Sequence, residues 1–304
     1  MRDYSVLDQA AGRLGCVCQK DAPLAPLTTF KIGGPADRLL RVETEAQLSG
    51  LLAAVQETGL PLLVLGKGSD LLVGDRGFRG VVVQLGETFR QVRLLEDCCT
   101  LLAGAGAPLA SVCTFARDHA LTGLEFAWGI PGSVGGAVFM NAGAYGGEIK
   151  DVAVKVCHVD LAGKPGQLLS KELDFSYRHS AYSAGGRIIT FAQLKLKPGR
   201  EEDIAGKMEE LMARRKKKQP YDMPSAGSTF KRPKNGYAAA LIESCHLKGQ
   251  RVGGAQVSEK HAGFVVNTGG ATCRDVLTLM EQIRETVLRQ TGVELEPEVR
   301  MVGE

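Results

Sequence analysis

Aromatic residues and long apolar runs are both scarce in this sequence. Phe, Trp and Tyr make up 6% of 304 residues, with one tryptophan. The apolar runs, such as residues 62–65 and 81–83, are short, whereas a helix that crosses a bilayer needs about 20 apolar residues. An acid stands early, at Asp3, and no apolar leader follows it. We therefore expect no signal peptide, no membrane span and a cytoplasmic protein.

Strong charge and metal-ligand spacing are also lacking. The formal net charge is +3, which is too small to predict nucleic-acid binding. The eight cysteines include Cys16, Cys18 and the adjacent Cys98 and Cys99, but no two have C-x-x-C spacing and no group of histidines accompanies them. We expect buried or incidental thiols and no metal site.

Glycine, in contrast, is abundant. The 38 glycines are about one residue in eight, against a usual share of ~7%. They show no G-X-Y period, and Leu, Val and Ile are plentiful, so a collagen-like or disordered chain is excluded. Eight of them lie between residues 123 and 147. Because each glycine in regular structure costs about 0.5–1 kcal/mol relative to alanine, a bound cofactor is the economical explanation.

Hydrophobic periodicity predicts mixed α and β structure. A capping box at Thr44 and Gln47 begins a helix that Gly59 ends. Further helices are expected over residues 108–119, 201–218, 238–245 and 272–290. Strands are expected over residues 38–42, 62–65, 81–83, 92–95, 101–103, 152–156, 189–196, 264–267 and 293–302. The first 30 or so residues lack a clear period, and we expect them to lie across the surface.

The loop after the strand at 62–65 reads Gly66-Lys67-Gly68-Ser69-Asp70. A Walker loop needs Ser or Thr directly after the lysine, where Gly68 stands, and a Rossmann loop needs a third glycine, where Leu71 stands. Small residues after a strand can still turn successive N–H groups toward an anion. An ordinary tight turn remains the alternative.

Three further stretches pair reactive side chains with small or turn-forming neighbours: Tyr177–Ser180, Ser225–Lys231 and Glu296–Arg300. Each is more often structural than catalytic when taken alone. The basic run Arg214–Lys218 ends a predicted helix that starts with acidic residues, as the helix dipole favours. No aromatic residues interleave with this run to suggest nucleic-acid binding.

Eight stretches, taken in order, resemble the UDP-N-acetylenolpyruvoylglucosamine reductase family in its short-loop form. They lie at residues 28–36, 66–73, 130–146, 177–180, 219–220, 226–231, 257–262 and 295–300. The resemblance implies an α+β protein, with a two-lobed FAD-binding domain of the vanillyl-alcohol-oxidase (PCMH) type and a C-terminal α+β substrate domain. The implied segments are an N-terminal segment 1–27, an FAD-binding domain 28–198 and a substrate-binding domain 199–304.

The resemblance implies an oxidoreductase of peptidoglycan precursor synthesis. Members of the family use NADPH to reduce bound FAD, and then reduce the enolpyruvyl double bond of UDP-N-acetylenolpyruvoylglucosamine to give UDP-N-acetylmuramate. Pro35 follows Gly33-Gly34 where covalent relatives often carry a histidine, so we expect non-covalent FAD. No metal, nucleic acid, membrane or obligate protein partner is expected.

The resemblance also implies roles for particular residues. The family's catalytic Arg, Ser and Glu match Arg178, Ser228 and Glu298: the arginine and glutamate would hold the substrate carboxylate, and the serine would donate a proton to the adjacent carbon. Cofactor contacts are expected at Gly33, Gly66, Lys67, Gly68, Ser69, Asp70, Leu71, Gly123, Pro131, Gly132, Gly136, Asn141 and Gly143. Substrate contacts are expected at Tyr177, Lys218, His261 and Asn267.

Two features depart from the family pattern. Asp70 stands where the family loop usually has asparagine, and the interval from Arg178 to Ser228 has no room for the tyrosine-bearing substrate loop of the long form. Two alternative functions remain. A flavin oxidase of the same superfamily would not need NADPH. A nucleotide- or RNA-binding protein that uses Arg214–Lys218 would be colourless and would bind in a strongly salt-dependent way.

Overall fold

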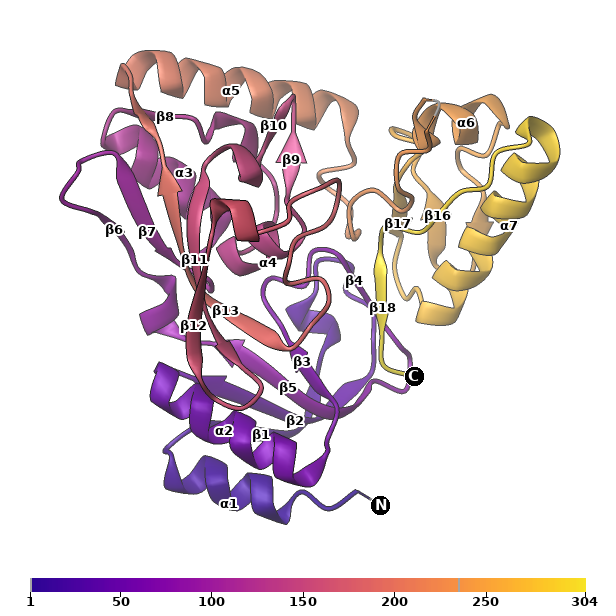
Figure 1. The fold of residues 1–304 in the computed structure, drawn as a ribbon. Coiled ribbons are helices and arrows are strands. Elements are labelled where there is room, and N and C mark those ends of the chain that lie inside the picture. Colours follow the sequence, from indigo (N-terminus) through magenta and orange to yellow (C-terminus); the bar gives the residue numbers. More distant parts are fainter. Residues whose placement is uncertain (1, 235) are drawn as a thin grey trace. The chain divides into compact units, whose positions relative to one another are not determined.

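The chain folds as two units, each assembled from separated stretches of sequence (Figure 1). The computed structural model describes residues 2–234 and 236–304. The first unit comprises the chain up to Lys20 together with Arg38–Lys67 and Gly80–Ala213, and the second comprises Asp21–Asp37, Gly68–Arg79 and Arg214–Glu304. Each unit buries a hydrophobic core of its own.

Five helices belong wholly or mainly to the first unit: α1 (Ser5–Arg13), α2 (Glu45–Thr58), α3 (Leu109–Asp118), α4 (Val134–Phe139) and α5 (Glu201–Lys218). Short 3-10 turns lie between them: η2 (Glu87–Arg90), η3 (Glu125–Ala127), η4 (Ile149–Asp151) and η5 (Ser170–Glu172). In Figure 1, α1 and α2 run side by side. Helix α5 buries Ile204, Met208 and Leu211, as its sequence period predicts.

Two larger sheets form the β structure of this unit. The first has the order β1 (Val17–Pro23), β2 (Pro35–Val42), β5 (Phe78–Leu85), β3 (Leu62–Val64), with β3 parallel to β5 and Leu63 opposite Val82. The second has the order β12 (Pro165–Leu169), β11 (Ala153–Asp160), β13 (Arg187–Lys195), β7 (Thr100–Gly104), β6 (Val92–Leu94), with antiparallel neighbours. Two small pairs join β9 (Gly143–Ala144) to β10 (Gly147–Glu148) and β8 (Leu121–Thr122) to β14 (Lys197–Pro198).

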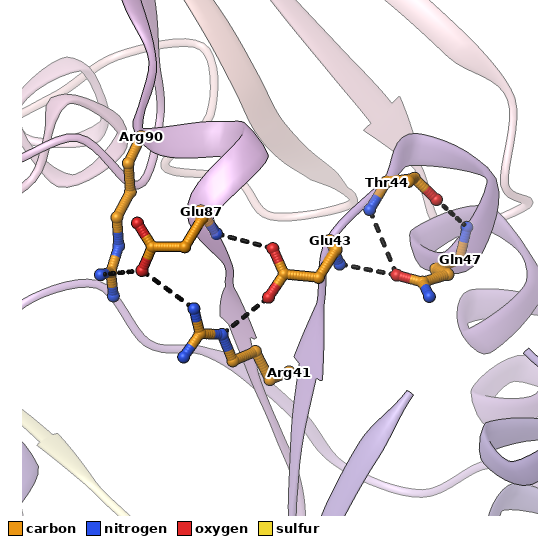
Figure 2. Close-up of polar contacts among 6 residues, drawn as sticks. All are labelled: Arg41, Glu43, Thr44, Gln47, Glu87 and Arg90. Carbon is orange, nitrogen blue, oxygen red and sulfur yellow. Dashed lines mark hydrogen bonds and ion pairs between the residues drawn. The ribbon is translucent and has the colours of Figure 1, made fainter. Parts of the chain in front are cut away.

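The start of α2 shows why a helix begins there (Figure 2). Thr44 and Gln47 form the expected capping box: Thr44 Oγ1 accepts the Gln47 N–H at 3.1 Å, and the side-chain oxygen Oε1 of Gln47 accepts the Thr44 N–H at 3.2 Å. The residue before the cap is Glu43. Its carboxylate accepts hydrogen bonds from the Arg41 side chain and from the Glu87 N–H, and so joins the end of β2 to η2. The Arg41–Glu43 ion pair is partly open to solvent, with 41% of each side chain exposed, so the cap contributes more to stability than this pair does.

The second unit is built on a three-stranded antiparallel sheet in the order β15 (Arg251–Val252), β16 (Ala255–Val257), β17 (Val265–Asn267). Helix α7 (Cys273–Thr291) packs on β15 and β16 and contacts α6 (Ala238–Ser244). The 3-10 turn η1 (Ala25–Leu27) also lies here. Strand β4 (Leu71–Val73) pairs in parallel with β18 (Arg300–Val302), with Leu72 opposite Met301. Thus the stretch after the glycine loop lies beside the end of the chain.

The structure adds to the expected pattern at one end of the chain and differs from it at the other. The first 30 or so residues, expected to lie across the surface, form helix α1 and strand β1, and Leu7, Ala10 and Ala11 of α1 are buried. Their spacing is helical, but two of the three are alanines, which give a weak hydrophobic signal. At the other end, only Arg300–Val302 of the expected strand 293–302 forms a strand. The residues before it include Pro297, which has no N–H to donate to a sheet.

Candidate functional site

The loop Gly66–Ser69 follows β3 and offers backbone donors that the protein does not use. Within the described residues, none of the N–H groups from Gly66 to Ser69 donates to a protein acceptor. Gly66 and Lys67 are exposed, Ser69 is half-buried and Gly68 is buried. Consecutive free N–H groups in such a turn suit a phosphate group. The unused N–H groups of this loop are therefore available to an anionic ligand.

The glycines of this loop also make close contacts within the protein. A Cβ at Gly66 would lie 2.5 Å from Ser133 Oγ, and one at Gly68, whose φ is 58°, would lie 2.6 Å from the Leu27 carbonyl oxygen. After the loop, Leu71 enters β4, and the Asp70 carbonyl accepts the Arg300 N–H at 3.0 Å. The expected cofactor residues 66–71 therefore form one continuous segment from the end of β3 into β4.

Other expected cofactor glycines have protein contacts that explain them. A Cβ at Gly33 would lie 2.4 Å from the Cβ of Val73. A Cβ at Gly143 would lie 2.7 Å from the Cγ of Glu148, its strand partner. Gly123 has a φ of 126°, which side chains rarely adopt, and its N–H already donates to Glu125. At these positions, packing or backbone conformation is a sufficient reason for glycine.

Helix α4 follows Pro131 and Gly132 and begins at the buried cap Ser133. Its first N–H groups are bonded inside the protein: Val134 and Gly135 donate to backbone carbonyls, and Gly136 donates to Ser133 Oγ at 3.3 Å. Pro131 and Gly136 are exposed. A ligand could therefore pack against the exposed surface at the start of α4, but the first N–H groups of this helix already have acceptors within the protein.

Arg178 lies in a tight turn of the first unit. Ser176 and His179 exchange two backbone hydrogen bonds of 3.2 Å each, so Tyr177 and Arg178 are the two central residues of the turn. Arg178 has a φ of 55°, and its guanidinium carbon lies 5.0 Å from the centroid of the Tyr177 ring. Tyr177 is 46% exposed, which leaves an aromatic surface beside the arginine.

Asn141 is buried behind this turn. Its amide nitrogen donates to the Ser176 carbonyl and to Glu148, at 3.0 Å each, and its amide oxygen accepts the Lys150 N–H at 2.9 Å. Lys150 also forms a 2.7 Å ion pair with Glu148 and lowers the pKa of that carboxyl, and the charge of Arg178 lowers it further. Nothing in the sequence marks Glu148 as a neighbour of Arg178, which lies 30 positions later in the chain.

Ser228 and Glu298 are brought together within the second unit. The Glu298 N–H donates to the Thr229 carbonyl at 2.9 Å, and Phe230 forms an antiparallel bridge with Pro297. Thr229 in turn connects to β17, because its Oγ1 accepts the Val265 N–H at 3.0 Å. Ser228 is half-buried and Glu298 is 9% exposed. A hydroxyl donor and a carboxylate therefore stand on neighbouring strand-like segments.

His261 and Lys218 also lie in the second unit. His261 Nδ1 accepts the Gly263 N–H at 3.2 Å, so the neutral ring carries its proton on Nε2 and can donate from there. Burial lowers the pKa of His261, and the charges of Lys248 and Lys218 act in the same direction. Lys218, at the exposed end of α5, is thus within electrostatic reach of this imidazole.

Asn267, expected to contact substrate, is 7% exposed and its amide bonds to backbone groups. The nitrogen donates to the Phe30 carbonyl at 3.1 Å, and the oxygen accepts N–H groups of Gly269 and Ala271. These bonds attach the stretch after β17 to the segment around Phe30. The preceding residue, Thr29, donates to the Gly68 carbonyl from its N–H and to the Ser225 carbonyl from its hydroxyl. Asn267 therefore helps to hold the segment around Phe30 in place, and the adjacent Thr29 bonds to the glycine loop at the Gly68 carbonyl.

Known proteins match the chain over nearly its whole length. A model of the UDP-N-acetylenolpyruvoylglucosamine reductase C-terminal domain matches residues 219–302, and an FAD-binding domain model matches residues 36–169. The UDP-N-acetylenolpyruvoylglucosamine reductase of Agathobacter rectalis is 48% identical over 94% of each chain. That of Caldanaerobacter subterraneus is 49% identical over 93% of this chain and 92% of its own. The chain belongs to the UDP-N-acetylenolpyruvoylglucosamine reductase family.

Solved structures agree with this assignment. The crystal structure of the Thermus caldophilus UDP-N-acetylenolpyruvylglucosamine reductase has a TM-score of 0.81 at 37% identity, over 94% of this chain and 98% of that one. A berberine bridge enzyme variant has a TM-score of 0.51 at 15% identity, over 64% of this chain and 44% of that one, which is a likeness of fold alone. The expected fold class, an FAD-binding domain of the PCMH type with a C-terminal reductase domain, is confirmed.

Two further findings concern membranes and metals. No helix in the described chain has the length and apolar character needed to cross a bilayer. Across residues 2–234 and 236–304, no group of three or more His, Cys, Asp or Glu side chains is placed to hold a metal ion, and the cysteines are free thiols.

Proposed function

We infer that this chain reduces UDP-N-acetylenolpyruvoylglucosamine to UDP-N-acetylmuramate in peptidoglycan precursor synthesis, with NADPH as the hydride donor. The observation that carries this conclusion is 48% identity to a reductase of this name over 94% of both chains, together with matches to both of the expected domains. The overall reaction adds one hydride and one proton across the enolpyruvyl double bond and converts NADPH to NADP⁺. We place the reaction in the cytoplasm, where NADPH and UDP-sugars are made.

FAD, when bound, supplies the hydride that it takes from NADPH. We propose that the free N–H groups of residues 66–69 hold its pyrophosphate, because they are consecutive, unused by the protein and lie directly after strand β3. Non-covalent binding is supported by Pro35 after Gly33-Gly34. The proposed functional division is residues 28–198 for the cofactor and 199–304 for the substrate; each family model matches within one of these segments.

The catalytic residues that the family resemblance implies suit the charge that develops in the substrate. Hydride addition at the terminal carbon leaves negative charge beside the substrate carboxylate, where a fixed cation stabilises it. We propose that Arg178 and Glu298 hold and polarise that carboxylate. Ser228 donates its hydroxyl proton to the adjacent carbon, which is basic enough to accept it when water is excluded. Tyr177, Lys218 and His261 remain proposed substrate contacts, and the Nε2–H of His261 is a suitable donor.

Steady-state turnover tests this function directly. Purified protein should oxidise NADPH only when UDP-N-acetylenolpyruvoylglucosamine is present. UDP-N-acetylglucosamine, which lacks the enolpyruvyl group, should support no turnover and is the matched control substrate. NADPH oxidation that does not depend on the enolpyruvyl group, or consumption of O₂ driven by an alcohol or sugar without NADPH, would instead indicate a flavin oxidase.

A further inference from the structure

The turn that carries Arg178 is strained and needs support from outside itself. A non-glycine residue in the left-handed region is strained and persists only where its surroundings hold it. Arg178 has a φ of 55°, and the two reciprocal bonds between Ser176 and His179 close a turn of only two central residues. The direction of the guanidinium therefore depends on what fixes the ends of this turn.

Asn141 fixes the first end. It is 1% exposed, and one hydrogen of its amide goes to the Ser176 carbonyl while the other goes to Glu148. Since its oxygen accepts the Lys150 N–H, the orientation of the amide is unambiguous. Asn141 itself has a φ of 42°, a conformation that asparagine tolerates better than most residues. Each polar group of this amide therefore has a partner within the protein.

The other end of the turn is fixed from the same short helix. Ser180 is fully buried, and its hydroxyl donates to the Phe139 carbonyl at 2.9 Å. Phe139 is the last residue of α4 and Asn141 lies two residues later. The segment from Phe139 to Asn141 thus forms hydrogen bonds with both ends of the turn. Because α4 begins at Ser133, against which Gly66 packs, this segment also connects the proposed pyrophosphate loop to Arg178.

We propose that Asn141 is a positioning residue for Arg178, acting through the Ser176 carbonyl and held in place by Glu148 and Lys150. Glu148 orients the amide and places a carboxylate near the guanidinium, while the Lys150 ammonium 2.7 Å away balances its charge. The assignment replaces the expected cofactor contact at Asn141 with a role inside the protein. It rests on the catalytic role proposed above for Arg178.

The test separates the two half-reactions in a double-mutant cycle. Asn141→Gly removes the amide but still allows the left-handed backbone, and it is compared with Arg178→Ala and with the double variant. Flavin reduction by NADPH and flavin reoxidation by the enolpyruvyl substrate are each followed by stopped-flow absorbance. Misplacing a catalytic group by about 1 Å can slow a reaction by roughly 100-fold. We therefore expect Asn141→Gly to slow reoxidation by roughly 10- to 100-fold and to leave flavin reduction and flavin content unchanged.

In the Arg178→Ala background, the same change should slow reoxidation no further than about 2-fold, since residues that act as one unit are not additive. Thr100→Val is the control: it removes a different buried polar group of the first unit, a hydroxyl that donates to Asp97 at 2.7 Å, and it should leave both steps intact. Full additivity of the two changes, or equal slowing of both half-reactions by Asn141→Gly, would overturn the proposal.

One outcome concerns the proposed function instead. If Arg178→Ala leaves reoxidation at the wild-type rate, the catalytic role of Arg178 is wrong and the positioning role falls with it. The reductase activity itself would still be visible in the wild-type half-reactions, so the two failures are distinguishable.

Discussion

Several non-glycine residues near the proposed chemistry hold a left-handed backbone. Asn141, Tyr145 and Arg178 have φ values of 42°, 53° and 55°. Tyr145 lies in the turn between β9 and β10, which contains Glu148, the partner of Asn141. Backbone strain of this kind collects where surrounding contacts fix a functional geometry. Here those contacts are the hydrogen bonds of a single buried amide and of the Ser180 hydroxyl.

Replacing Ser228 should separate the two half-reactions. Ser228→Ala removes the proposed proton donor, and flavin reduction by NADPH does not need that proton. We expect NADPH to bleach the flavin at the wild-type rate, while turnover with the enolpyruvyl substrate falls by roughly 100-fold or more. Stopped-flow absorbance and steady-state NADPH oxidation measure the two effects.

The matched control for this change is Ser225→Ala, three residues earlier. Ser225 contributes its carbonyl, which accepts from Thr29 at 2.7 Å, so loss of its hydroxyl leaves that bond in place. This variant should turn over normally. Undiminished steady-state turnover by Ser228→Ala would remove the serine from its proposed role.

His261 should make the fold sensitive to mild acid. Burial lowers its pKa below the ordinary value of 6.5, so the folded chain binds this proton less tightly than the unfolded chain. Its stabilising effect as a neutral side chain is complete above pH 6.5 and is lost as the pH falls through 6.5 toward the lowered value. When the pH falls from about 7.5 to 5.5, the free energy of unfolding should therefore decrease less in the His261→Asn variant than in the wild type.

Urea unfolding at the two pH values measures this difference. His246→Asn is the control, because His246 lies in the same unit but is exposed, and asparagine suits its φ of 57°. That variant should keep the wild-type pH dependence. If His261→Asn also keeps it, another group is responsible for the acid sensitivity; His158, whose pKa burial also lowers, is the first candidate.

At the scale of elements, the helices with caps were predictable because the signals that start and end them are local. Thr44, the expected cap, and Thr272, the first residue of the helix expected over residues 272–290, both accept backbone N–H groups, and Gly59 and Gly292 both end their helices in the left-handed conformation. Helix α4 was not predicted. It is six residues long and contains two glycines, so neither period nor propensity marks it. Its position depends on contacts with residues distant in sequence.

Two glycine substitutions should change stability in opposite directions. Gly206 lies in the exposed interior of α5 with open space around its Cβ position, so Gly206→Ala should raise the free energy of unfolding by about 0.5–1 kcal/mol. Gly292 has a φ of 72° after α7, so Gly292→Ala should lower it by about 1 kcal/mol. Thermal or urea unfolding reports both. Equal signs for the two changes would contradict the conformational explanation.

At the scale of the whole molecule, the division into two units could not be read from local patterns. Strand β4 belongs with the C-terminal part of the chain because Leu72 pairs with Met301, and no local rule foresees a partner so far along the sequence. The order of the eight family-like stretches indicated the domain composition, which hydrophobic periodicity could not. It predicted an FAD-binding domain and a C-terminal reductase domain, and family models of these two kinds match residues 36–169 and 219–302.

The glycine excess has two explanations rather than one. The sequence suggested a cofactor, and the free N–H groups of residues 66–69 support that at one loop. Gly33 and Gly143 are instead accounted for by Val73 and Glu148, which occupy the space a Cβ would need. Composition cannot distinguish a backbone that approaches a ligand from one that approaches its own neighbours.

The visible spectrum of the purified protein tests the central claim most directly. Without O₂, the protein should show oxidised flavin, lose that absorbance when one equivalent of NADPH is added, and recover it when UDP-N-acetylenolpyruvoylglucosamine follows, with UDP-N-acetylmuramate formed in equal amount. A colourless protein that cannot be reconstituted with FAD, or a flavin that NADPH bleaches but the enolpyruvyl substrate cannot reoxidise, would contradict it.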